Sequence, residues 1–79
     1  MDFKIIETEP PVLLHRDRND DGDETVVITA FVFDDNGPDY QLEESIKLPS
    51  ESMVWSFISD YSQESAVQWL EEQMKRNGV

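Results

Sequence analysis

The sequence predicts an α+β domain, in which a three- to four-stranded antiparallel meander is followed by two helices packed on one face, in two layers. Residues 3–48 hold short apolar runs with strand alternation, bounded by Pro, Gly, Asn and Asp. Residues 50–77 hold apolar side chains at helical spacing. A chain of 79 residues has the size of one small domain with a modest core. We therefore expect a single domain over residues 1–79.

The first strands are short and are separated by prolines. Residues 3–6 (FKII) form either a short edge strand or a bent continuation of the strand that follows. Pro10 and Pro11 separate them from residues 12–16 (VLLHR), because proline is confined to sheet edges and strand ends. Residues 12–16 are the expected partner of the central strand, and the acidic turn at residues 17–24 (DRNDDGDE) joins the two.

Residues 26–33 (VVITAFVF) are the expected central strand. They are β-branched or aromatic and apolar on both alternating faces, which is typical of a strand covered on both sides. Asn36 and Gly37 then predict a hairpin turn into residues 40–48. In that strand Tyr40, Leu42, Ile46 and Leu48 point one way, and Gln41, Glu43, Ser45 and Lys47 face water. Glu44 falls on the apolar side, so we expect it near a sheet edge.

Two helices are expected after Pro49, with Ser50 as the cap of the first. One apolar set is Val54, Phe57, Ile58 and Tyr61; the other is Ala66, Val67, Leu70 and Met74, flanked by Trp69. At about 100° per residue the two sets point about 160° apart, so a single straight helix would bury opposite faces. This predicts a break at residues 60–63, with Ser62 capping the second helix.

Negative charge dominates the composition. Eighteen acidic residues face six basic ones, for a formal net charge of −12, and between residues 19 and 74 the only base is Lys47. Such a chain is expected to be repelled by nucleic acid and anionic membranes and attracted to basic protein surfaces. The alternative, that the charge serves only solubility, stays open.

The composition also favours a cytoplasmic protein. There is no cysteine, which excludes disulfides and thiolate metal sites and suits a reducing compartment. No secretory signal is recognisable, and the longest apolar stretch, residues 26–33, is too short to span a bilayer. We expect no membrane partner.

Part of the acidic turn is similar to a calcium loop. Asp17, Asn19, Asp21 and Gly22 match the first half of the EF-hand pattern, in which alternate oxygen ligands surround the cation. The glutamate required at loop position twelve would fall on Ile28, and both flanks are predicted strands. We therefore expect a solvated turn and no cofactor, with Asp17, Asn19 and Asp21 as weak candidates for a divalent cation.

Candidate catalytic groups are few. His15 is the only histidine, and no serine has a plausible base partner nearby in the sequence. No glycine-rich phosphate loop is present either. We expect the protein not to be an enzyme.

The two acidic turns give the chain its candidate binding residues. In a meander these turns lie at opposite ends of the sheet, about 25 Å apart for strands of about eight residues. The candidates are Asp34, Asp35, Asn36, Asp39 and Glu43 at one end, and Asp20, Asp21, Asp23 and Glu24 at the other. Carboxylates can replace phosphates in a groove lined with lysine and arginine, because arginine forks bind both groups in a bidentate manner.

Two segments resemble the small acidic phage anti-CRISPR proteins that inhibit Cas9. The first is residues 34–40 (DDNGPDY), and the second is residues 51–59 (ESMVWSFIS). In the best-known member of that group, three antiparallel strands precede helices, and an Asn/Asp/Gly-rich turn ends in an acid before a tyrosine. The matching positions are Asn36, Gly37, Asp39 and Tyr40. The resemblance implies that this turn occupies the Cas9 site that reads the short DNA motif beside the target.

These observations favour a small non-enzymatic inhibitor of the DNA-mimic type, from a phage or mobile element. Its expected partner is a basic surface of a nucleic-acid-binding protein, such as a CRISPR-Cas effector, with no direct binding to nucleic acid. The protein itself is expected to be a monomer or a homodimer. The alternatives are a bacterial structural or adaptor domain and, third, a divalent-cation-binding module.

Overall fold

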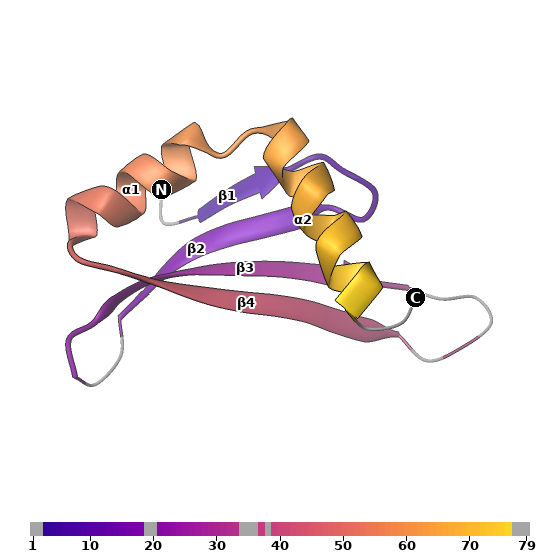
Figure 1. Ribbon diagram of the computed structural model, residues 1–79, viewed down its shortest axis with the longest axis horizontal. Coiled ribbons are helices and arrows are strands. Elements are labelled where there is room, and N and C mark those ends of the chain that lie inside the picture. The colour runs from indigo at the N-terminus through magenta and orange to yellow at the C-terminus, as the bar shows by residue number, and fades with distance from the viewer. Residues whose placement is uncertain (1–2, 19–20, 34–36, 38, 77–79) are drawn as a thin grey trace.

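The computed structural model describes residues 3–18, 21–33, 37 and 39–76, and all structural statements concern those residues. Four strands precede two helices: β1 (Phe3–Ile6), β2 (Val12–Arg18), β3 (Glu24–Val32), β4 (Tyr40–Leu48), α1 (Glu51–Asp60) and α2 (Gln63–Arg76). The strands form one antiparallel sheet in the order β1-β2-β3-β4, and both helices lie on the same side of it (Figure 1). The predicted fold class is confirmed. The first segment is a separate edge strand rather than a continuation of the second.

The strand register assigns each side chain to one of two sheet faces. Leu14 pairs with Ile28, and Val26 pairs with Ile46. Because paired residues share a face, these side chains all lie on the face that carries the helices. The other face, called the open face below, consists of Phe3, Ile5, Leu13, His15, Asp17, Thr25, Val27, Thr29, Phe31, Gln41, Glu43, Ser45 and Lys47.

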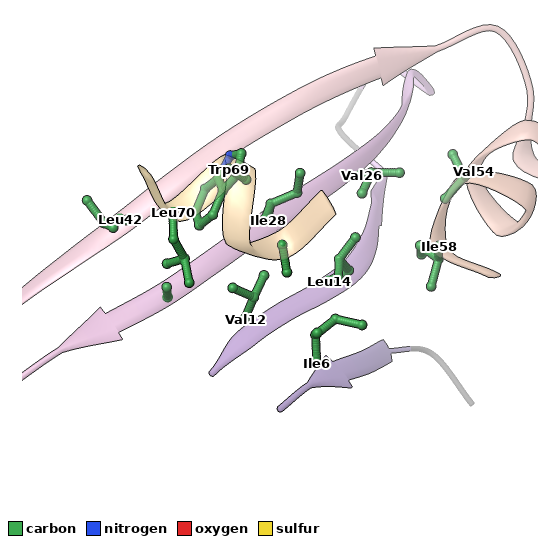
Figure 2. Packing of buried hydrophobic residues seen from close by; sticks show 12 residues of the cluster. Ile6, Val12, Leu14, Val26, Ile28, Leu42, Val54, Ile58, Trp69 and Leu70 are labelled. Atoms are coloured by element: carbon green, nitrogen blue, oxygen red, sulfur yellow. The ribbon is translucent and has the colours of Figure 1, made fainter. Parts of the chain in front are cut away.

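The hydrophobic core lies between the sheet and the helices. Side chains from all four strands and both helices form one cluster: Ile6, Val12, Leu14, Val26, Ile28, Ala30, Leu42, Val54, Ile58, Ala66, Trp69 and Leu70. Figure 2 shows Val54 and Ile58 of α1 at one end of this layer and Trp69 and Leu70 of α2 at the other. The two helices therefore divide one sheet face between them.

The prediction that β3 is covered on both sides is wrong. Its Val26, Ile28 and Ala30 lie under the helices, whereas Phe31 on the open face is 51% exposed. Val27 and Thr29 on that face are nevertheless buried, because each has a neighbour on β2 and another on β4. Two helices are enough to cover only one face of this sheet, so the second apolar face stays open.

The helix break occurs where the apolar pattern predicts it. The Ser50 hydroxyl accepts the backbone N–H of Met53 at the start of α1, at 3.4 Å. The chain then leaves the helix after Asp60, and the Ser62 hydroxyl accepts the backbone N–H of Ser65 at 3.1 Å. Ser50 and Ser62 thus act as the two N-caps, as expected.

Helix α2 is rotated relative to the prediction. Val67, expected in the core, is exposed, whereas Trp69 and Gln73 are buried. The reason lies on β4, where one oxygen of Glu44 accepts Trp69 Nε1 at 3.3 Å and Gln73 Nε2 at 3.0 Å. Glu44, which breaks the alternation of its edge strand, is therefore the polar anchor of α2.

Helix α1 is anchored at its C-terminal end by Lys4 of β1. The Lys4 ammonium donates to the carbonyl oxygens of Ile58, Ser59 and Tyr61 at 3.2, 3.1 and 2.9 Å. The last turn of α1 has no basic residue of its own. Lys4 thus supplies the positive charge that a helix C-terminus favours, and it ties β1 to α1.

We expect Lys4→Met to lower the free energy of unfolding by about 1–2 kcal/mol, because three carbonyls lose a charged donor while the aliphatic stem is kept. Urea unfolding followed by tryptophan fluorescence measures the change. Lys75→Met, in the exposed last turn of α2, removes the same charge and is expected to cost less than about 0.5 kcal/mol. Equal losses in the two variants would contradict the capping role.

Glu44→Ala is expected to destabilise the protein by about 2 kcal/mol, because it removes the acceptor shared by the buried Trp69 and Gln73. Its neighbour Glu43 is exposed on the open face, and Glu43→Ala is expected to stay within about 0.5 kcal/mol of the wild type. Thermal unfolding of both variants in the same buffer checks the difference. A cost for Glu43→Ala that matches Glu44→Ala would rule out the anchoring role.

Candidate interaction surface

The residues proposed for a divalent cation are only partly described. Within the described part of the chain, no group of three or more His, Asp or Glu side chains could hold a metal ion. Asp17 is exposed at the end of β2, and its Oδ1 accepts the backbone N–H of Arg18 at 2.9 Å. Asp21 is also exposed, and Asn19 lies outside the described residues. Cation binding by this turn stays a prediction.

The candidate binding residues lie at the two ends of the sheet. Of these residues, Asp20, Asp34, Asp35 and Asn36 fall outside the described ranges. Asp21, Asp23 and Glu24 lie at the hairpin between β2 and β3, and Asp39 and Glu43 lie at the start of β4. The start of β3 and the start of β4 lie at opposite ends of the sheet, along the longest dimension of the molecule, 41 Å (Figure 1). They form two separate acidic regions rather than one.

Glu24 is engaged within the fold. Both of its oxygens accept from Arg16 of β2, Oε2 from Nε at 2.7 Å and Oε1 from Nη2 at 2.8 Å. These bonds to the guanidinium hold the pKa of the Glu24 carboxyl below its usual value. Arg16 Nη2 also lies 3.7 Å from an oxygen of Glu51, in the first turn of α1. This ion pair therefore joins the β2–β3 hairpin to the start of α1.

Asp23 is paired as well. Its carboxylate lies 2.9 Å from the ammonium of Lys47, which projects from the end of β4. Arg18 lies close by, because its guanidinium comes near Gly22 of the same turn. The β2–β3 end of the sheet thus places Arg16, Arg18 and Lys47 among its carboxylates. Its acidic character is largely compensated.

The charges at the other end of the sheet, at the start of β4, are arranged differently. Asp39 and Glu43 are exposed, and Glu43 accepts Gln41 Nε2 at 3.0 Å, which is a neutral partner. Among the described residues no lysine or arginine forms an ion pair with Glu43. Glu43 also lies on the open face, beside Thr29 of β3. Glu43 therefore presents its negative charge outward at this end of the sheet.

An apolar surface that was not predicted from the sequence adjoins this region. Phe3 and Ile5 of β1 are 47% and 56% exposed on the open face, and Phe31 of β3 is half exposed there. Leu13 of β2 is partly exposed between β1 and β3. The signal was present in the sequence, because apolar residues on both faces of a central strand need a second cover that this chain does not provide. Exposed aromatic side chains of this kind are typical of contact surfaces.

The Arg16–Glu24 pair predicts a specific pH dependence. Because the pKa of Glu24 is lowered in the folded state, the pair stabilises the protein above the ordinary glutamate pKa of 4.5, and this stabilisation is lost as the pH falls through the folded-state value. The difference in unfolding free energy between the wild type and Glu24→Gln should therefore shrink below about pH 4.5. Urea titrations at a series of pH values measure it.

The control is the same comparison in an Arg16→Met background. Without the guanidinium, Glu24→Gln should show a much weaker pH dependence, because the cause of the pKa shift is gone. An unchanged pH dependence in that background would show that another group stabilises the Glu24 carboxylate.

Neither helix within the described residues has the length and apolar character needed to cross a membrane. Comparison of the chain with protein-family models, with curated proteins and with solved structures gave no match in any of the three.

Proposed function

We propose that this chain is a non-enzymatic inhibitor of the DNA-mimic type, of phage or mobile-element origin. It blocks a nucleic-acid-binding protein by occupying that protein's basic surface. The observation that carries the proposal is that half of the basic side chains contact other groups of the same fold. Lys4, Arg16 and Lys47, half of the six basic residues, form contacts within the fold. Only Arg18, Lys75 and Arg76 remain to balance the many carboxylates that are not paired with Arg16 or Lys47.

Most of the carboxylates, in contrast, face solvent. The exposed acidic residues of the described chain are Glu7, Glu9, Asp17, Asp21, Asp39, Glu43, Glu51, Asp60, Glu64, Glu71 and Glu72. A surface of this sign attracts a cationic groove over the Debye length, about 8 Å at physiological ionic strength. It repels nucleic acid itself, so the partner is a protein and not a nucleic acid.

The start of β4 is the best-supported contact region. Asp39 and Glu43 are exposed there, and the adjoining Asp34 and Asp35 add two carboxylates in the sequence. Lysine and arginine side chains that normally contact phosphates can bind such carboxylates instead. A CRISPR-Cas effector is a suitable target, because the resemblance to Cas9 inhibitors centres on this same turn.

Reversing the charge of this region is expected to weaken partner binding about tenfold, which corresponds to about 1.4 kcal/mol. The test uses the tagged protein to capture proteins from a bacterial lysate fraction enriched on heparin, which retains proteins with cationic grooves. Added salt and added duplex DNA should both release the captured proteins, because the acids and the DNA occupy the same surface. The double variant Asp39→Lys/Glu43→Lys should recover much less of them.

Glu71→Lys/Glu72→Lys provides the matched control, because it changes the net charge equally but lies on the exposed side of α2. This variant should retain most of the binding. Equal losses in both double variants would indicate that only the overall charge matters. Captured proteins that resist both salt and DNA would contradict the proposal. For a Cas9–guide RNA complex, displacement of fluorescent target DNA tests the suggested target directly.

A further inference from the structure

We infer that the open face of the sheet is the docking surface for the partner, and that the partner presents an apolar patch bordered by lysine and arginine side chains. The inference rests on the proposed function, because it names the second surface through which the same basic protein is held. Three features of the open face support it: exposed apolar side chains, a mostly acidic border and a poor fit to a second copy of the chain.

The apolar part of the open face extends over three adjacent strands. Ile5 of β1 pairs with Leu13 of β2, and Leu13 pairs in turn with Thr29 of β3. Phe3 lies at one end of this area on β1, and Phe31 follows Thr29 along β3. Side chains in these positions are cross-strand or diagonal neighbours, so they form one area and not scattered single residues. Nothing in the described chain covers them.

The charged residues at the border of this area are mostly acidic. Asp17 ends the β2 row of the open face, and Glu43 lies on the β4 side of Thr29. Among the described residues, Lys47 is the only lysine or arginine on the open face, and its ammonium lies 2.9 Å from the carboxylate of Asp23. The charge presented around the apolar area is therefore negative. A complementary surface has apolar side chains at its centre and cations at its edge.

A depression beside β1 shows the same combination of properties. Ile5, Pro11 and the exposed Val67 of α2 line it together with the carboxylate-bearing Glu7 and Glu9. The aliphatic stem of a lysine or arginine can pack on such apolar side chains while its charged head reaches the carboxylates. The apolar and acidic character of the open face thus continues around the β1 edge.

A second copy of this chain does not fit the same surface. Each copy carries a formal net charge of −12, and two open faces packed together would bring Glu43 and Asp17 of both copies into one interface. Like charges placed together in an interface oppose association. The preferred occupant is therefore a protein of opposite charge.

The test uses two synthetic peptides of equal length and equal charge as probes. One alternates lysine and phenylalanine, and the other alternates lysine and serine. Fluorescence anisotropy should show at least about tenfold tighter binding of the phenylalanine peptide. In nuclear magnetic resonance spectra of the protein, that peptide should shift the backbone amide signals of β1, β2 and β3 on the open face most strongly.

Three single variants assign the effect to the open face. Phe31→Ser, and separately Ile5→Ser, should reduce binding of the phenylalanine peptide toward that of the serine peptide. Met53→Ser is the matched control, because Met53 is 49% exposed, nearly the same as Phe31, but lies on α1. It should leave binding of both peptides unchanged. Circular dichroism confirms that each variant is folded, and either sheet variant alone suffices for the test.

Four other outcomes would count against the inference, and they differ in what they overturn. Equal binding of the two peptides, or an equal loss with Met53→Ser, would overturn the docking surface while leaving the charge-based function intact. Failure of both peptides to bind at low salt would instead overturn the proposed function. A wild-type mass of two chains by light scattering, reduced to one chain in Phe31→Ser, would show that a second copy covers the face.

Discussion

The structure depends on one constraint: a four-stranded sheet has two faces, and two short helices can cover only one of them. Helices of 10 and 14 residues lie over different ends of the same sheet face and bury a single apolar layer. The small size of the domain makes each contact in this layer important, because a chain of this length buries a modest share of its surface. The exposed Phe3, Ile5 and Phe31 on the other face follow directly from this geometry. The covering of only one sheet face therefore limits the core and also leaves the candidate docking surface exposed.

Polar contacts fix where the helices lie on the covered face. Lys4 holds the C-terminal end of α1, Arg16 connects Glu24 to the start of α1, and Glu44 holds α2 through Trp69. Each contact joins residues that are distant in the sequence or on different elements, so the helices are fixed in position as well as attracted by apolar burial. The use of Lys4 and Arg16 in these contacts has a second effect. Lys4 donates to backbone carbonyls and Arg16 pairs with Glu24 and Glu51, so neither cation compensates the other exposed carboxylates.

The elements of the fold could be predicted from local patterns, whereas the site depended on contacts between elements. Strand alternation and the turn at Gly37 defined the sheet, and the change in direction of the apolar stripe located the helix break. The rotation of α2 was missed, because it depends on Glu44, an acceptor on another element. The engagement of Glu24 by Arg16 was missed for a similar reason, since it requires the hairpin register. The open face was missed because an apolar pattern shows which residues avoid water but does not show what covers them.

The two surfaces at the start of β4 can act at different stages of binding. Carboxylates such as Asp39 and Glu43 attract a cationic protein at long range, and their effect is screened by salt. Apolar side chains such as Phe31 act only in contact, and salt does not screen their burial. An inhibitor that used charge alone would bind many basic proteins weakly and would be released as the ionic strength rose. An adjoining apolar area adds a requirement for a matching shape and composition, which discriminates among basic partners. In the proposed inhibitor, the open face would therefore provide a physical basis for selecting one target among basic proteins.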